Sequence, residues 1–266
     1  MASKERKNDL LKDLHQSGRY GELADLCRKR VEKLRAMYGP RHGKVGFALK
    51  QLAYTHYLQG DLPRSEESLR AAIEVLGDSG SSKTGLYRAC QLDLARVCIF
   101  IGKHAETESL LGEVLSAAAA LPSASQRLCA GAHFVRSKLQ RKEKDFEGAE
   151  QSLEMAEIWI LQQLGEESRY YASLQHQKGE VYWRQGRFSE AEHALRKSMS
   201  AHETILETES ADYAMAMSLL GEVLAKRGNR EEASESQGRA LEILKRVRPA
   251  GHSNILQVER LVAEPS

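Results

Sequence analysis

The chain has 266 residues and a formal net charge of +2, with 41% hydrophobic, 29% charged and 6% aromatic residues. This balance argues against a protein that binds nucleic acid or an anionic membrane through its overall charge. No apolar run approaches the roughly 18 residues that a membrane-spanning helix needs. Only five prolines occur, and the many helix-forming residues predict an all-α chain.

The N-terminal segment, MASKERKNDLLKDL, is charged and lacks the apolar centre of a secretory signal peptide. The four cysteines are Cys27, Cys90, Cys98 and Cys129. On a shared helix, Cys90 and Cys98 would lie about 12 Å apart, which is too far for a disulfide. We therefore expect reduced thiols and a cytoplasmic protein, with association with the cytoskeleton left open.

A pattern anchored on glycine recurs every 42 residues. Small residues dominate the positions seven before and five after each anchor, and leucine dominates the position nine after it. This predicts a helix, a turn in which glycine takes the left-handed conformation, and a second helix packed closely on the first. The anchors are Gly18, Gly60, Gly102, Lys144, Gly186 and Gly228.

The register places thirteen helices along the chain, which we interpret as a single domain over residues 1–266. In chain order they are 7–17, 20–37, 43–59, 62–76, 85–101, 104–120, 126–142, 146–164, 168–185, 188–206, 210–227, 230–247 and 253–263. The first twelve form about six hairpins, and the last is expected to cap the final apolar face.

The small residues on both sides of the turn and the glycine within it resemble the tetratricopeptide repeat. The 42-residue unit is similar to the subclass found in kinesin light chains, as are YGPRHGKVGFALKQLAYTHYLQGD and LGEESRYYASLQHQKGEVYWRQGRFSEAE. The resemblance implies a right-handed superhelical α-solenoid that serves as a protein-binding scaffold or adaptor. The Asn pair that holds peptide backbone in kinesin light chains has no counterpart here, so no cargo is carried over.

The stretch GDSGSSKTG, residues 77–85, is similar in part to a phosphate-binding loop. It lacks the second glycine, since Ser82 precedes Lys83, and a helical rather than a strand pattern precedes it. We interpret it as a connector between hairpins, with Thr84 as the N-cap of the next helix. The sequence contains no catalytic or metal-binding motif that we recognise, so we expect no enzyme, no cofactor and no metal site.

The first helix of each hairpin is expected to line the concave side of the solenoid. Aromatic and arginine residues on its inward row are typical of binding hot spots, and Arg96, Lys138 and Arg141 come from adjacent units and are expected to cluster. We therefore predict a groove for acidic protein or peptide segments with apolar anchors. The candidate residues are Lys50, Tyr54, Tyr57, Arg96, Phe134, Lys138, Arg141, His176, Trp183 and Arg184.

Other interpretations stay open. The aromatic residues could pack between neighbouring first helices, with the basic residues neutralising nearby carboxylates. The chain could be a structural subunit of a large assembly, cytoskeletal or ciliary, that binds through convex faces. It could also hold a phosphate-bearing ligand at the basic cluster. We expect membership of a multiprotein complex, with no nucleic acid partner and no membrane insertion.

Overall fold

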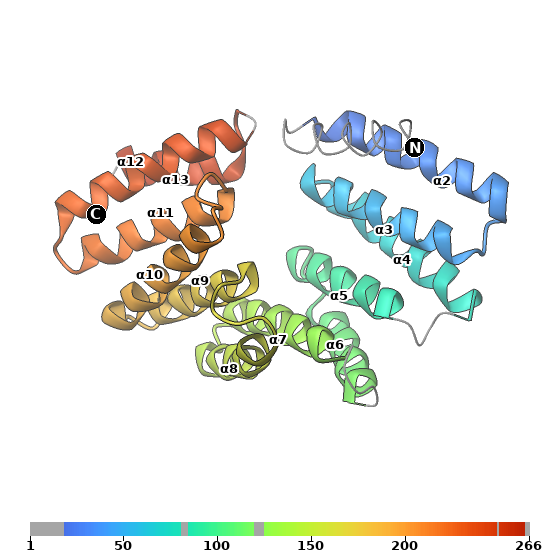
Figure 1. Cartoon of the computed structure of the whole chain (residues 1–266), viewed down its shortest axis with the longest axis horizontal. Coiled ribbons are helices and arrows are strands. Elements are labelled where there is room, and N and C mark those ends of the chain that lie inside the picture. Colours follow the sequence, from blue (N-terminus) through green and yellow to red (C-terminus); the bar gives the residue numbers. More distant parts are fainter. Residues whose placement is uncertain (1–18, 81–84, 120–124, 249, 264–266) are drawn as a thin grey trace. The chain divides into compact units, whose positions relative to one another are not determined.

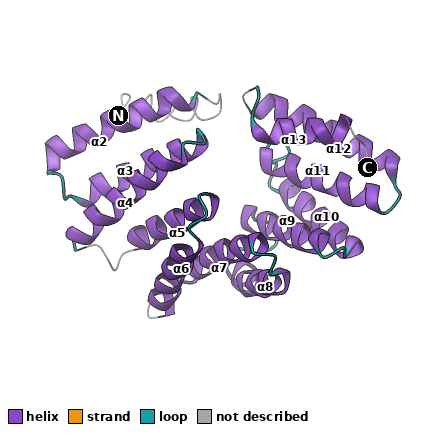
Figure 2. Ribbon diagram, turned by 180° about the vertical axis from the view of Figure 1, so that it is seen from behind, coloured by secondary structure: helices purple, strands orange, loops and turns teal. Residues whose placement is uncertain are grey.

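The computed structural model describes residues 19–80, 85–119, 125–248 and 250–263. Every regular element in these ranges is a helix, and none is a strand (Figures 1 and 2). The all-α helical-repeat fold is therefore confirmed. The predicted helix at 7–17, the anchor Gly18 and the charged N-terminal segment lie outside the described residues.

The helices follow the predicted order, and their ends differ from the predicted ends by two residues at most. They are α2 (Tyr20–Tyr38), α3 (Gly43–Leu58), α4 (Leu62–Asp78), α5 (Gly85–Phe100), α6 (His104–Ala119), α7 (Ser125–Lys142), α8 (Phe146–Gln163), α9 (Arg169–Arg184), α10 (Phe188–Thr204), α11 (Ala211–Lys226), α12 (Arg230–Val247) and α13 (Ser253–Ala263).

The described anchors all adopt the left-handed conformation, from φ +64° at Lys144 to φ +88° at Gly228. After each anchor, the next N–H donates to a carbonyl five residues earlier, as Asp61 does to His56. This bond satisfies a carbonyl that the end of the first helix would otherwise leave unpaired. The Asp61 side chain then caps α4 by accepting from the Arg64 N–H. One short segment thus ends one helix and begins the next.

The small residues beside the turn lie where two helices approach closely. A Cβ placed on Gly179 of α9 would lie 2.6 Å from Leu195 Cγ of α10, closer than packed atoms allow. Earlier in the chain, the Ser65 hydroxyl of α4 donates to the Ala53 carbonyl of α3 over 2.9 Å. The predicted role of these small residues is confirmed at both places.

The chain divides into two compact units, Met1–Leu139 and Gln140–Ser266, with the boundary inside α7. The prediction of one superhelical domain over residues 1–266 stays a prediction. In the second unit, Ile255 and Val258 of α13 pack against Met217 of α11 and Leu244 of α12. This packing agrees with the capping role predicted for the last helix, which stays a prediction.

The remaining sequence-level expectations concern the connector and the cysteines. Helix α4 ends at Asp78 and α5 begins at Gly85, so the segment that resembles a phosphate loop lies between helices. Lys83 and Thr84 fall outside the described residues. All four cysteines are free thiols, and burial raises the pKa of Cys90 to about 12. None of the described helices is long and apolar enough to cross a bilayer.

Candidate partner-binding site

Helices α9, α11 and α13 of the second unit enclose a pocket of about 670 Å³. Three predicted binding residues lie in it, and they meet residues of the inward row predicted for the next hairpin. The lining residues are His176, Glu180, Trp183, Arg184, Met215, Ser218, Leu219, Glu222, Ser253, Leu256, Gln257, Arg260 and Leu261.

The pocket combines an aromatic surface with two available cations. Trp183 is half-buried, and the Arg184 guanidinium lies 4.6 Å from the centroid of its ring. Arg184 and Arg260 are both exposed. Neither makes an ion pair with any carboxylate in the part of the chain that the structure describes. Apolar side chains, Leu256 among them, complete the wall beside these cations.

Two carboxylates of the pocket have opposite environments. Burial acts to raise the pKa of Glu180, but the charge and hydrogen bond of Arg141 outweigh it, so this pKa lies below its ordinary value. Burial raises the pKa of Glu222, and repulsion from Glu180 adds to that rise against the attraction of Arg184. Glu222 has no ion-pair partner within the described ranges, so it is an available hydrogen-bonding group.

One helical turn before Glu222, the Ser218 side chain is buried at 1% exposure. Its hydroxyl has no hydrogen-bond partner in the structure, and a buried hydroxyl without a partner costs free energy. Because the Ser218 hydroxyl is buried, Glu222 is the polar group of α11 that the pocket presents to a ligand.

The first unit has a smaller pocket of about 350 Å³ between α2 and α3. The predicted residues Lys50 and Tyr54 line it, with Leu23, Leu26, Cys27, Arg30, Phe47, Gln51 and Thr55. Phe47 is 44% exposed and Tyr54 is 51% exposed. This pocket therefore presents two aromatic faces to solvent.

Two of the basic residues predicted for the first unit, Lys50 and Arg96, are paired with a carboxylate. Asp93 of α5 accepts from Lys50 Nζ at 2.6 Å and from Arg96 Nη1 at 2.9 Å. Tyr57 packs beside Phe100 with ring centroids 6.0 Å apart. Burial raises the pKa of the Tyr57 hydroxyl, with Arg96 opposing the rise. Neutralisation of a nearby carboxylate, the alternative interpretation, therefore describes Lys50 and Arg96.

The other predicted residues are spread over α7. Phe134 and Lys138 are half-buried in the first unit. Arg141 belongs to the second unit, where it pairs with Glu180. The clustering of Arg96, Lys138 and Arg141 stays a prediction. No group of three or more potential ligands that could hold a metal ion occurs among the residues described.

Sequence reasoning missed the contribution of α13 to the second pocket. The helix was expected only to cap the array, and Ile255 and Val258 do so. The pocket residues Leu256 and Arg260 lie four positions apart on another side of the same helix. The signal available in the sequence was a leucine and an arginine four positions apart, on a different side of the helix from Ile255 and Val258.

Comparison with known proteins supports the repeat assignment. Residues 159–246 match the family model of the tetratricopeptide repeat. No curated protein sequence matches the chain. Among solved structures it is similar to BtubC (BKLC) from P. vanneervenii at 18% identity and TM-score 0.64, covering 84% of this chain and 90% of that one.

Two further structures show the same fold. A putative kinesin light chain from Podosopora anserina with nearly identical TPR-like repeats matches at 21% identity and TM-score 0.57, covering 76% of this chain and 96% of that one. PilW, a type IV pilus biogenesis factor, matches at 15% identity and TM-score 0.60, covering 94% of this chain and 97% of that one. At these identities the likeness concerns the fold alone.

Proposed function

We propose that the chain, which matches the tetratricopeptide-repeat family model over residues 159–246, is a scaffold or adaptor without chemistry of its own. It holds segments of partner proteins on the face that the first helices of its hairpins form. The preferred segment is acidic and carries an aromatic or aliphatic anchor. The main contact is the pocket of α9, α11 and α13.

The observation that carries this proposal is the pair of available cations beside an aromatic surface. Arg184 and Arg260 are exposed and free of ion pairs among the described residues, so acidic side chains of a ligand can reach them. Trp183, Met215 and Leu256 offer the apolar contact for an anchor. Aromatic and arginine residues in such a pocket are the types that dominate binding energy.

Helix α11 supplies a further contact. A backbone N–H of a bound peptide can donate to the Glu222 carboxylate, which lines the pocket and makes no ion pair among the described residues. The peptide would therefore meet a carboxylate whose hydrogen-bonding capacity is not already used.

The first-unit pocket of Phe47, Lys50 and Tyr54 is proposed as a second anchor site. The other predicted residues, Tyr57, Arg96, Phe134, Lys138, Arg141 and His176, are proposed to shape the binding face. Because Arg96 and Arg141 are already paired with Asp93 and Glu180, a phosphate-bearing or nucleic acid ligand is the weaker candidate. The four free thiols fit a reducing, cytoplasmic compartment.

A peptide-display selection on the purified full chain tests the proposal. We expect enrichment of acidic peptides with an aromatic or aliphatic anchor. The double variant Arg184→Glu with Arg260→Glu should lose this enrichment and keep its helical circular dichroism. Lys197→Glu, an exposed position on α10, is the matched control and should select like the wild type. If the double variant enriched the same peptides as the wild type, the pocket would not be the binding site.

A further inference from the structure

The first-unit pocket lies on rows of α2 that a hairpin's own first helix covers later in the chain. Leu23 and Cys27, five and nine residues after the anchor, line the pocket. In α10 the same two rows are Ala191 and Leu195, both fully buried. A Cβ placed on Gly179 of α9, seven before the anchor, would lie 2.6 Å from Leu195 Cγ. These rows of α10 are therefore covered by α9.

The same contact recurs in other hairpins. A Cβ placed on Gly221 of α11 would lie 2.7 Å from Gln237 Cγ of α12. In the first unit, the Thr107 hydroxyl of α6 donates to the Ala95 carbonyl of α5 over 3.4 Å. The row seven before the anchor thus meets the rows five and nine after it in both units. In the first hairpin that row is Leu11, which lies outside the described residues.

The sequence before α2 has the apolar residues that this contact needs. Leu10, Leu11 and Leu14 are eight, seven and four residues before the anchor, so on a helix they share one side. At the same rows α3 carries Leu52, Ala53 and His56, all of them buried. The segment 7–17 therefore has apolar side chains at rows that are covered by protein in α3.

The opposite side of the segment is charged. In α3, the rows twelve and five before the anchor are Ala48 and Thr55, both buried. This side of α3 faces the preceding helix, because the Thr55 hydroxyl lies 3.8 Å from Cys27 Sγ of α2. In the segment the same rows are Arg6 and Asp13. Charge on one side and leucine on the other are typical of a helix with one buried face.

We propose that residues 7–17 form a helix that docks on Leu23 and Cys27 and closes the pocket between α2 and α3. A partner's apolar anchor then enters only by displacing this segment. The competition rests on the proposed function, which makes the pocket an anchor site; the docking does not. The segment is covalently joined to a wall of the pocket, which gives it a high effective concentration there.

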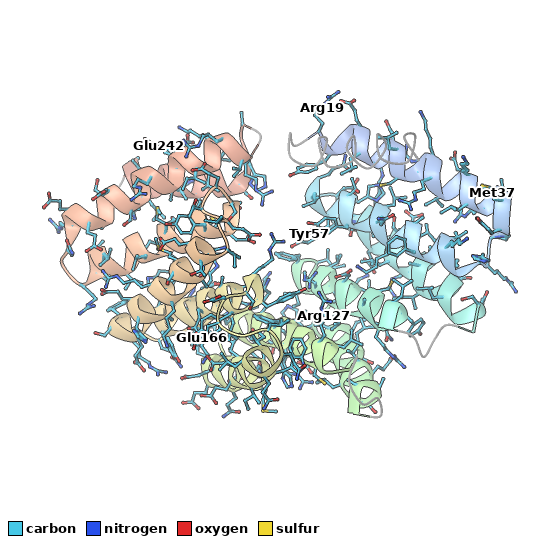
Figure 3. All side chains as sticks on the ribbon, in the orientation of Figure 1. Arg19, Met37, Tyr57, Arg127, Glu166 and Glu242 are labelled. Atoms are coloured by element: carbon cyan, nitrogen blue, oxygen red, sulfur yellow. The ribbon has the colours of Figure 1, made fainter. Side chains whose placement is uncertain are left out.

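The segment begins in the right place and has sufficient length. Arg19, the first described residue, lies at the start of α2, with Met37 near its other end (Figure 3). A chain that turns at Gly18 runs back along α2. A helix over residues 7–17 is about 16 Å long, whereas Leu23 and Arg30, the outermost pocket residues of α2, lie about 10 Å apart. The segment can therefore cover this wall of the pocket.

One polar group of the pocket fits the same register. Gln51 Oε1 is buried and has no hydrogen-bond partner among the described residues. Between α3 and α5, the residue ten before one anchor meets the residue nine before the next, as Lys50 Nζ lies 2.6 Å from Asp93. In the segment and α3, these rows are Asn8 and Gln51. The Asn8 amide can thus donate to the unpaired oxygen.

The docked segment is expected to be displaceable because its close-approach positions are large. Leu11 and Leu23 occupy the rows at which α9 and α10 carry Gly179 and Ala191. Two leucines keep the helices farther apart than a glycine and an alanine do, and a looser fit buries less surface. The segment therefore acts as a cover that competes with a ligand.

A disulfide trap on the full chain tests the docking without any ligand. Leu11→Cys places a thiol at the row that meets the position nine after the anchor, where the natural residue is Cys27. Oxidation with copper(II)-phenanthroline should join position 11 to Cys27, as peptide mapping by mass spectrometry would show. Asp13→Cys, on the charged side, is the matched control and should not join Cys27. No bond from position 11, or equal bonding from position 13, overturns the docking and leaves the proposed function untouched.

Alkylation of Cys27 by N-ethylmaleimide tests the cover. Leu10→Asp with Leu14→Asp should release the segment and speed the alkylation of Cys27, while half-buried Cys129 keeps its wild-type rate and reports the integrity of the fold. An unchanged rate at Cys27 overturns the closed pocket. In the peptide-display selection, the same double variant should enrich anchors that Tyr54→Asp then abolishes. If the disulfide forms but this selection matches the wild type, the segment docks without competing, and the regulatory part of the proposal is wrong.

Discussion

The two units differ in whether a carboxylate accompanies the basic residues near their pockets. In the first unit, Lys50 and Arg96 both contact Asp93, which neutralises part of their charge. In the second unit, the predicted Arg141 pairs with Glu180, whereas the predicted Arg184 and the unpredicted Arg260 are exposed and make no ion pair in the described part of the chain. An arginine on a binding face is thus informative only when its carboxylate neighbours are known.

The difference decides which pocket can recognise charge. A cation that already has a carboxylate at hydrogen-bond distance gives little further attraction to an acidic ligand. Of the two cations that line the first-unit pocket, Lys50 is paired with Asp93 and Arg30 makes no ion pair among the described residues. The second-unit pocket has two such cations, Arg184 and Arg260, so we expect it to bind an acidic ligand more strongly than the first-unit pocket does.

The largest expected effect concerns how α9 is held against α10. Ala191 is fully buried, and its carbonyl would lie 3.4 Å from a Cβ placed on Gly179. Ala191→Trp should force the helices apart and destabilise the chain by about 3 kcal/mol or more. Urea denaturation followed by circular dichroism measures this loss, and peptide binding by the second-unit pocket should fall with it.

The exposed Ala263, near the end of α13, provides the matched site. Ala263→Trp should leave the unfolding midpoint nearly unchanged. If Ala191→Trp behaved in the same way, the small residues beside the turn would have no packing role. The corresponding variant of the first unit is Ser65→Trp, which should repeat the loss because Ser65 is 1% exposed.

The next effect separates a paired cation from an available one. Arg141→Glu replaces the partner of the partly buried Glu180 by a second carboxylate, which should cost about 2–3 kcal/mol of stability. Arg184→Glu removes an exposed charge and should cost less than about 0.5 kcal/mol. For binding of an acidic peptide the order should reverse, because Arg184→Glu should lower the affinity while the fold is retained. Equal destabilisation by the two variants would contradict the distinction.

The helices could be predicted closely because their signals are local. A turn residue, a cap and two small positions recur every 42 residues, and each acts within its own hairpin. Lys144 is the clearest example. The 42-residue spacing alone predicted that this lysine takes the turn position usually held by glycine, and its φ of +64° is left-handed.

The binding site could be predicted only in part. The row from His176 to Trp183 follows from helical periodicity, and both residues line the pocket. The pairing of Arg96 with Asp93 spans three residues on one helix, so the sequence offered a signal that was not used. The pairing of Arg141 with Glu180 joins different helices, and no local pattern indicates it. Whether a basic residue is free to bind a ligand depends on neighbours that are distant in the sequence, and sequence reasoning alone therefore could not predict it.

A smaller effect links stability to pH through one histidine in each unit, buried His202 in the second and half-buried His133 in the first. Burial lowers the pKa of His202 in the second unit, with Arg169 adding to this and Asp212 and Glu207 opposing it. Burial and Arg136 lower the pKa of His133 in the first unit. The unfolded chain therefore binds these protons more tightly, so stability is highest above pH 6.5 and falls as the pH drops through that value.

His202→Leu tests the contribution of the second unit. Leucine or isoleucine occupies this row in four other second helices, as Leu34, Leu76, Ile160 and Leu244. The variant should lose less stability than the wild type as the pH falls from 7 to 5.5, because it has no imidazole that must remain neutral in the folded state. Urea titrations at several pH values measure the difference. An unchanged pH dependence would show that the proton is taken up elsewhere, and His133→Leu then tests the first unit in the same way.

The smallest expected effect lies at Lys144, where the second unit begins its first turn without a glycine. A left-handed conformation costs a non-glycine residue about 1 kcal/mol, and Lys144 adopts φ +64°. Lys144→Gly should relieve this cost, partly offset by the greater freedom of glycine in the unfolded chain, for a net gain of about 0.5 kcal/mol. Gly186→Lys is the reciprocal change, because Gly186 has φ +76°, and it should destabilise by about 1 kcal/mol. Urea unfolding of both variants measures the pair. A gain in unfolding free energy for Lys144→Gly with a loss for Gly186→Lys would show that the left-handed conformation of the turn sets the stability at this position. A loss for Lys144→Gly would instead mean that the lysine side chain makes a stabilising contribution of its own.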